Sequence, residues 1–153
     1  MPRVKFSTNG IRPEIGIFSY GRSKEASETS GQFEFDVSSL RDPSGQKQFN
    51  GFNGVYPDVR DWVGTDRRVP IIIRDCLLLA DDLIKPKPQG DSKVPKAMSV
   101  WLSFSFKDFH GKWIAPAVAE LVAERLSKEG FNVAVHHKCI PEEQFPKIAV
   151  ESK

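Results

Sequence analysis

The chain has few cysteines, little net charge and no long hydrophobic run. Its 153 residues include only two cysteines, Cys76 and Cys139, which are too few for a disulfide framework and indicate reduced thiols. No apolar stretch reaches the roughly 18 residues that a membrane-spanning helix needs, and the first residues lack the apolar core of a secretory signal. We therefore expect a cytoplasmic protein that does not associate with a membrane.

The 22 basic and 20 acidic residues leave a net charge of +2, which excludes a strongly basic nucleic-acid-binding tail. Hydrophobic residues make up 39% of the chain, enough for the core of one domain of ordinary size. The positive charge is uneven, because residues 85–112 hold six lysines and only two aspartates. With Trp101 and Trp113 nearby, this segment is compatible with an RNA backbone contact, or equally with a solvated connector.

Proline and glycine clusters divide the chain into short elements. We expect an N-terminal tail over 1–13, one domain over 14–138 and a loose C-terminal tail over 139–153. Within the domain the pattern predicts strands at 15–20 and 33–37, loops at 21–31 and 42–54, helices at 56–63 and 70–84, and a connector at 85–96.

The segment 98–135 gives the clearest pattern. Over 98–106 a period of two predicts a strand, with Met98, Val100, Leu102, Phe104 and Phe106 on one face and Ser99, Trp101, Ser103 and Ser105 on the other. A loop over 107–113, a helix over 114–129 ending before Gly130, and a strand over 131–135 follow. This strand–helix–strand unit predicts two parallel strands with a right-handed crossover. We therefore expect an α/β fold, with a small, mainly parallel sheet of about four strands flanked by helices.

The loop between this strand and helix is the best candidate for a ligand site. The start of a helix offers unpaired N–H groups, and loops at this position commonly bind ligands in α/β sheets. Lys107, His110 and Lys112 add positive charge, and Gly111 lets the backbone approach a ligand closely. The pattern favours an anion, most simply a phosphate. The alternative is a solvated loop whose basic residues only keep it soluble.

Several other kinds of site are excluded. The loop is not a Walker A motif, because Phe106 and Trp113 stand where glycine and Ser or Thr are required. Neither cysteine is followed by the arginine of a cysteine phosphatase. His136 and His137 are adjacent and point to opposite faces of a strand, so they do not form a metal site. We expect no cofactor and no metal.

Five short motifs follow one another in order over residues 15–138. They are Phe18-Ser19-Tyr20-Gly21, Phe35-Asp36-Val37-Ser38-Ser39-Leu40-Arg41-Asp42-Pro43, Asn53-Gly54-Val55, the strand–loop–helix unit over 98–130, and Asn132-Val133 followed by His136-His137-Lys138. Together they resemble the C-terminal domain of the bacterial RNase adapter protein RapZ, whose patterns include F-[GS]-[FY]-K-x-G, F-D-V-R-x-L-x-N-P and N-V…R-H-R. The resemblance implies the fold, and a domain that binds a small regulatory RNA and glucosamine 6-phosphate.

The chain departs from this family at the ligand loop. The family loop reads G-C-T-G-G-x-H-R-S, and over 107–115 only Gly111 keeps its place. Trp113 and Ile114 replace the family's histidine and arginine, and Ser38 replaces the arginine of F-D-V-R. Losing a guanidinium removes a bidentate phosphate contact, and the indole of Trp113 is expected to narrow the pocket.

Three hypotheses of function follow. The first is a non-enzymatic binding module for RNA or a sugar phosphate. It assigns the phosphate to the loop residues and adds Arg22, His137 and Lys138 from neighbouring strand ends. The second is a protein-interaction module that kept the fold and lost the pocket, with an apolar patch near Trp113 and a homo-oligomer or partner surface there. The third is a small hydrolase or phosphotransferase using His110 with Asp108.

Overall fold

The computed structural model describes residues 3–4, 14–22, 31–84 and 102–146. The described strands form one sheet in the order β1-β5-β2-β4-β3. Their bounds are β1 Arg3–Val4, β2 Ile15–Gly21, β3 Phe33–Asp36, β4 Leu102–Asp108 and β5 Val133–His137, and the helices are α1 Pro57–Gly64, α2 Val69–Leu83 and α3 Ile114–Lys128. Strands β5, β2, β4 and β3 are parallel, and the two-residue β1 pairs antiparallel with β5. The expected α/β fold with a mainly parallel sheet is confirmed.

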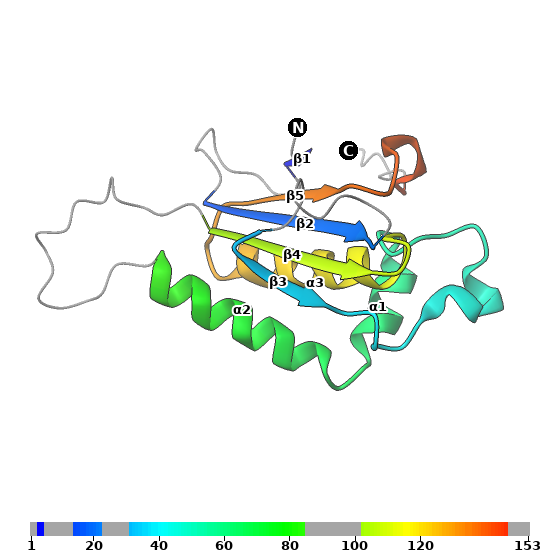
Figure 1. Cartoon of the computed structure of the whole chain (residues 1–153), viewed down its shortest axis with the longest axis horizontal. Helices are drawn as coiled ribbons and strands as arrows, with labels where there is room; N and C mark the ends of the chain where they lie inside the picture. The colour runs from blue at the N-terminus through cyan, green and yellow to red at the C-terminus, as the bar shows by residue number, and fades with distance from the viewer. Residues whose placement is uncertain (1–2, 5–13, 23–30, 85–101, 147–153) are drawn as a thin grey trace, which may run out of the picture.

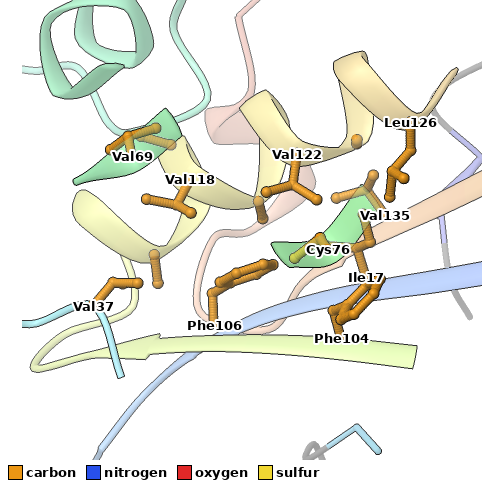
Figure 2. Close-up of a cluster of buried hydrophobic side chains, with 14 of the residues drawn as sticks. Ile17, Val37, Val69, Cys76, Phe104, Phe106, Val118, Val122, Leu126 and Val135 are labelled. Atoms are coloured by element: carbon orange, nitrogen blue, oxygen red, sulfur yellow. The ribbon is translucent and has the colours of Figure 1, made fainter. Parts of the chain in front are cut away.

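Helix α3 lies across one face of the sheet, and α1 and α2 pack beside it (Figure 1). The core forms where the apolar stripe of α3 meets the inward residues of β2, β4 and β5 (Figure 2). Phe104 and Phe106 of β4 are fully buried there, as the period-two pattern predicts, and Cys76 of α2 completes the cluster. Burial raises the pKa of the Cys76 thiol far above its usual value, so this cysteine is an inert core residue. None of the described helices is long and apolar enough to span a membrane.

The predicted helices lie within one residue of the observed bounds, but two strands differ by more. Strand β4 continues to Asp108 rather than ending at 106, and the last strand is displaced. It was expected at 131–135 and occupies Val133–His137. The reason is the turn after α3: Gly130 has φ 97°, and the Phe131 amide bonds back to the Leu126 carbonyl at 3.1 Å. Residue 131 therefore closes the helix, whereas the Asn132 carbonyl accepts from the amides of Glu14 and Ile15 at 2.9 and 3.1 Å. Both adjacent histidines belong to the strand.

The segments expected to be tails contribute to the domain. The β1 residues lie within the expected N-terminal tail, where they extend the sheet beyond β5. In the expected C-terminal tail, Glu142–Gln144 form a short 3-10 helix. The Asn53 side-chain amide donates to the Gln144 carbonyl at 2.8 Å, and this bond attaches the 3-10 helix to the loop before α1. Residues 23–30, 85–101 and 147–153, including the expected connector and the start of the β4 pattern, lie outside the described residues.

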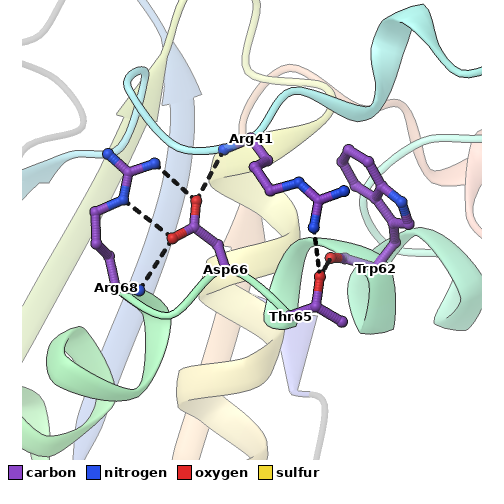
Figure 3. Close-up of polar contacts among 5 residues, drawn as sticks. All are labelled: Arg41, Trp62, Thr65, Asp66 and Arg68. Atoms are coloured by element: carbon purple, nitrogen blue, oxygen red, sulfur yellow. Dashed lines mark hydrogen bonds and ion pairs between the residues drawn. The ribbon is translucent and has the colours of Figure 1, made fainter.

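A carboxylate between α1 and α2 fixes the chain that follows β3 (Figure 3). Asp66 is buried and accepts hydrogen bonds from the Arg41 amide at 3.1 Å and from the Arg68 amide and guanidinium at 2.8 to 3.0 Å. The Arg41 guanidinium lies 4.1 Å from the centre of the Trp62 ring and donates to Thr65. The hydrogen bonds from Arg68 hold the pKa of Asp66 well below its usual range.

We expect Asp66→Asn to lower the free energy of unfolding at pH 7 by about 2–3 kcal/mol, because a neutral amide cannot accept all of these bonds. The folded pKa lies below the unfolded value, so the contribution is complete above about pH 4 and is lost as pH falls below it. Urea unfolding between pH 7 and pH 2 measures both effects. The free energy of unfolding of Asp66→Asn should decrease less steeply with falling pH than that of the unmodified chain. Asp58→Asn is the control: Asp58 is exposed, and its substitution should cost under about 1 kcal/mol.

Candidate anion site

The start of α3 is capped from within the chain. Asp108, the last residue of β4, is 3% exposed, and its carboxylate accepts hydrogen bonds from the amides of Gly111, Ile114 and Ala115. The bonds to Ile114 and Ala115 are both 2.9 Å long. Because Asp108 already satisfies these N–H groups, they cannot bind a ligand anion. The structure therefore corrects the expectation that the helix amides form the anion site.

Two glycines allow the loop to lie against the end of β2. A Cβ atom at Gly21 would come 2.6 Å from the His110 backbone, and one at Gly111 would come 2.5 Å from the Gly21 nitrogen. Gly111 also has φ 72°, which disfavours other residues. We expected the backbone at Gly111 to come close to a ligand. In the structure it comes close to the end of β2 instead, and this contact holds the loop against that strand.

A cavity of about 610 Å³ lies between this loop and the chain that follows β5. Its lining residues come from these two segments: His110, Lys112, Trp113, Lys138, Cys139, Ile140 and Pro141. The set holds two lysines and a histidine and no carboxylate. Among the described residues, neither lysine side chain takes part in an ion pair. The half-buried indole of Trp113 forms part of the wall and leaves the cavity open.

Two predicted site residues do not line this cavity, and each pairs with a carboxylate. Lys107 belongs to β4 rather than to the loop, and its Nζ lies 3.8 Å from a carboxylate oxygen of Glu34. Arg22 donates to Asp36 at 2.8 Å. Hydrogen bonds from Ser38, with that of Arg22, lower the pKa of Asp36 to about 2, so this carboxylate stays charged at neutral pH. The structure brings together His110, Lys112 and Lys138, but not Lys107 or Arg22.

His137 is buried beneath the cavity and forms a hydrogen-bonded chain. Its Nδ1 lies 2.7 Å from the Ser19 hydroxyl, and its Nε2 lies 2.7 Å from a carboxylate oxygen of Glu120. It does not line the cavity. Sequence reasoning missed Ser19 and Glu120, which lie far apart in the chain. One signal in the sequence could have indicated this chain: Glu120 is an acidic residue among the apolar and small residues on the buried side of α3, and a buried carboxylate needs a polar partner.

The structure gives no support to a hydrolase built on His110 and Asp108. The Asp108 carboxylate is bonded to backbone amides, and no hydrogen bond joins it to His110. The Ser19–His137–Glu120 chain has the residue types of a catalytic triad, but Ser19 is fully buried, and substrate cannot reach its hydroxyl. Within the described ranges, no three His, Cys, Asp or Glu side chains are placed to hold one metal ion.

These features define an open α/β domain whose candidate site lies at the carboxyl ends of parallel strands, the usual position for ligands in this fold class. The family model of the RapZ C-terminal domain matches residues 13–141, and the chain belongs to that family. No curated protein matches the chain. The resemblance read from the short motifs is therefore confirmed.

Proposed function

We propose that this domain is a non-enzymatic binding module for a phosphate-bearing ligand, RNA or a sugar phosphate, in the cavity between the β4–α3 loop and the chain after β5. The observation that carries the proposal is the convergence of Lys112, Lys138 and His110 on one hollow without a carboxylate. Its volume lies within the range of about 300–1,000 Å³ typical of small-ligand pockets. Membership of the RapZ C-terminal domain family supports a phosphorylated ligand.

The cationic side chains, rather than the helix amides, supply the attraction in this proposal. Asp108 neutralises the positive end of α3, so the start of the helix contributes little net charge. Lys112 and Lys138 stand on opposite walls, one before α3 and one after β5. A phosphate between them would contact two ammonium groups, and exposed His110 offers a ring N–H donor.

We expect the double variant Lys112→Gln, Lys138→Gln to lose at least about tenfold in affinity for a phosphate ligand, because two charge-assisted contacts are removed. Inorganic pyrophosphate, a sugar phosphate and a short single-stranded RNA serve as probes in calorimetric titrations at low and high salt. For RNA, the slope of affinity against salt should also decrease in the variant.

Lys47→Gln, Lys128→Gln is the matched control, because it also removes two exposed lysine charges, neither of which lines the cavity, and it should bind like the unmodified chain. Absence of binding by every probe at low salt would refute the proposal. Equal binding by the double variant and the control would also count against this cavity.

A protein-interaction module is a second candidate, favoured by the exposed apolar residues of α2. Ile71, Leu78 and Leu83 of this helix are all exposed, and a hollow of about 310 Å³ lies beside it. The α2 residues lie apart from Trp113, where the sequence suggested an apolar patch, and exposed Phe109 lies in the loop that leads to Trp113. Stabilisation of the chain by any of the phosphate probes argues for the first candidate.

A further inference from the structure

An exposed aromatic ring lies in the same loop as the cavity-lining residue His110. Phe109 directly precedes His110 in the β4–α3 loop, and 58% of its surface is exposed. Among the described residues it is the most exposed large hydrophobic side chain. Neither the core nor the cavity wall includes this residue, so the face of its ring that Arg22 does not cover is available to a ligand that reaches beyond the cavity.

The ring is paired with a guanidinium that the fold holds in place. Arg22 lies with its Cζ 4.7 Å from the centre of the Phe109 ring. Its guanidinium donates to Asp36 at 2.8 Å and to Ser38 at 3.3 Å, and its backbone amide donates to the Asp108 carbonyl at 2.9 Å. These bonds tie Arg22 to the end of β3, to Ser38 just after it and to the end of β4, so the guanidinium has little orientational freedom to lose when a ligand binds.

Such a pair suits one class of ligand. Bases stack on aromatic rings and on guanidinium planes, and a stacked base typically adds about tenfold or more to affinity. A sugar phosphate has no planar π system and would gain less from Phe109 than a base would. We propose that the ligand is a nucleoside phosphate, free or as part of a single RNA strand, with its phosphate in the cavity and its base stacked on the Phe109–Arg22 pair. This inference rests on the proposed function and specifies the ligand of the same site.

Adenosine 5′-monophosphate and ribose 5-phosphate test the inference, since they differ only in the base. We expect the unmodified chain to bind the nucleotide about tenfold or more tightly than the sugar phosphate in calorimetric titrations. Phe109→Ala should abolish this preference without weakening ribose 5-phosphate, and Phe109→Trp should retain it. Because the ring is exposed, both variants should fold, and their melting temperatures check this. A short single-stranded RNA distinguishes a strand from a free nucleotide, and either source supports the inference.

The outcomes separate this inference from the proposal on which it rests. Equal affinity for the two phosphates, or a preference that persists in Phe109→Ala, overturns base stacking while leaving the phosphate site intact. Failure of both ligands to bind overturns the phosphate site, and base stacking with it. Loss of affinity for both ligands in the variant Lys112→Gln, Lys138→Gln, together with loss of the preference in Phe109→Ala, supports both.

Discussion

Replacing Asp108 by alanine is expected to lower the free energy of unfolding by about 3–5 kcal/mol. Its buried carboxylate accepts bonds from three backbone amides at the start of α3, and alanine would leave all three without their partner. Each buried amide that loses its acceptor typically costs about 1–3 kcal/mol. Urea unfolding at neutral pH measures the difference.

Asp42→Ala provides the matched control for this experiment. Asp42 is exposed and caps a single amide, that of Ser44 at 2.9 Å, so its loss should cost about 1 kcal/mol or less. If Asp108→Ala proved no more destabilising than this control, the role of Asp108 as the cap of α3 would be refuted.

Removal of the buried Glu120 carboxylate is expected to cost a similar amount. Glu120→Ala leaves the buried His137 ring without the acceptor that lies 2.7 Å from its Nε2, and breaking a buried pair in this way typically costs about 3–5 kcal/mol. The double variant Glu120→Ala, His137→Ala should be less destabilised than the sum of the two single variants, because the second substitution removes a group that has already lost its partner.

Urea unfolding of the four proteins in this cycle gives the coupling energy directly. Glu124→Ala controls for the loss of a carboxylate from the same helix, and its half-buried position should make the cost about 1 kcal/mol or less. Strict additivity of the Glu120 and His137 substitutions would show that the two side chains do not interact.

The elements that could be predicted from the sequence are those with a strong local pattern. Strand β4 alternates buried phenylalanines with serines, and α3 presents an apolar stripe and ends before Gly130, so both are placed by spacing alone. The shift of β5 could not be predicted, since it depends on a hydrogen bond from Phe131 back to the last turn of α3.

The candidate site could be predicted only in part. The βαβ pattern predicts that Lys112, in the loop after β4, and Lys138, just after β5, lie near each other, because the carboxyl ends of parallel strands meet at one edge of a sheet. The roles of Asp108 and His137 depend on tertiary contacts. From the sequence, Asp108 is a candidate acid–base residue. Its hydrogen bonds from the amides of Gly111, Ile114 and Ala115 show that it caps α3. His137 and its two partners come from positions 19, 120 and 137, which no local pattern connects.

The internal cap on α3 has a consequence for selectivity. A rigid ring of amides would favour one anion geometry, whereas the ammonium groups of Lys112 and Lys138 are carried by long, adaptable chains. At the proposed site, these chains could adapt to the geometry of both phosphate monoesters and diesters, and the more highly charged monoesters would gain more from the two ammonium groups. At the proposed site, discrimination between ligands would then depend on the walls formed by Trp113 and Pro141, which limit the shape and size of the charged group, and on the Phe109–Arg22 pair outside the cavity.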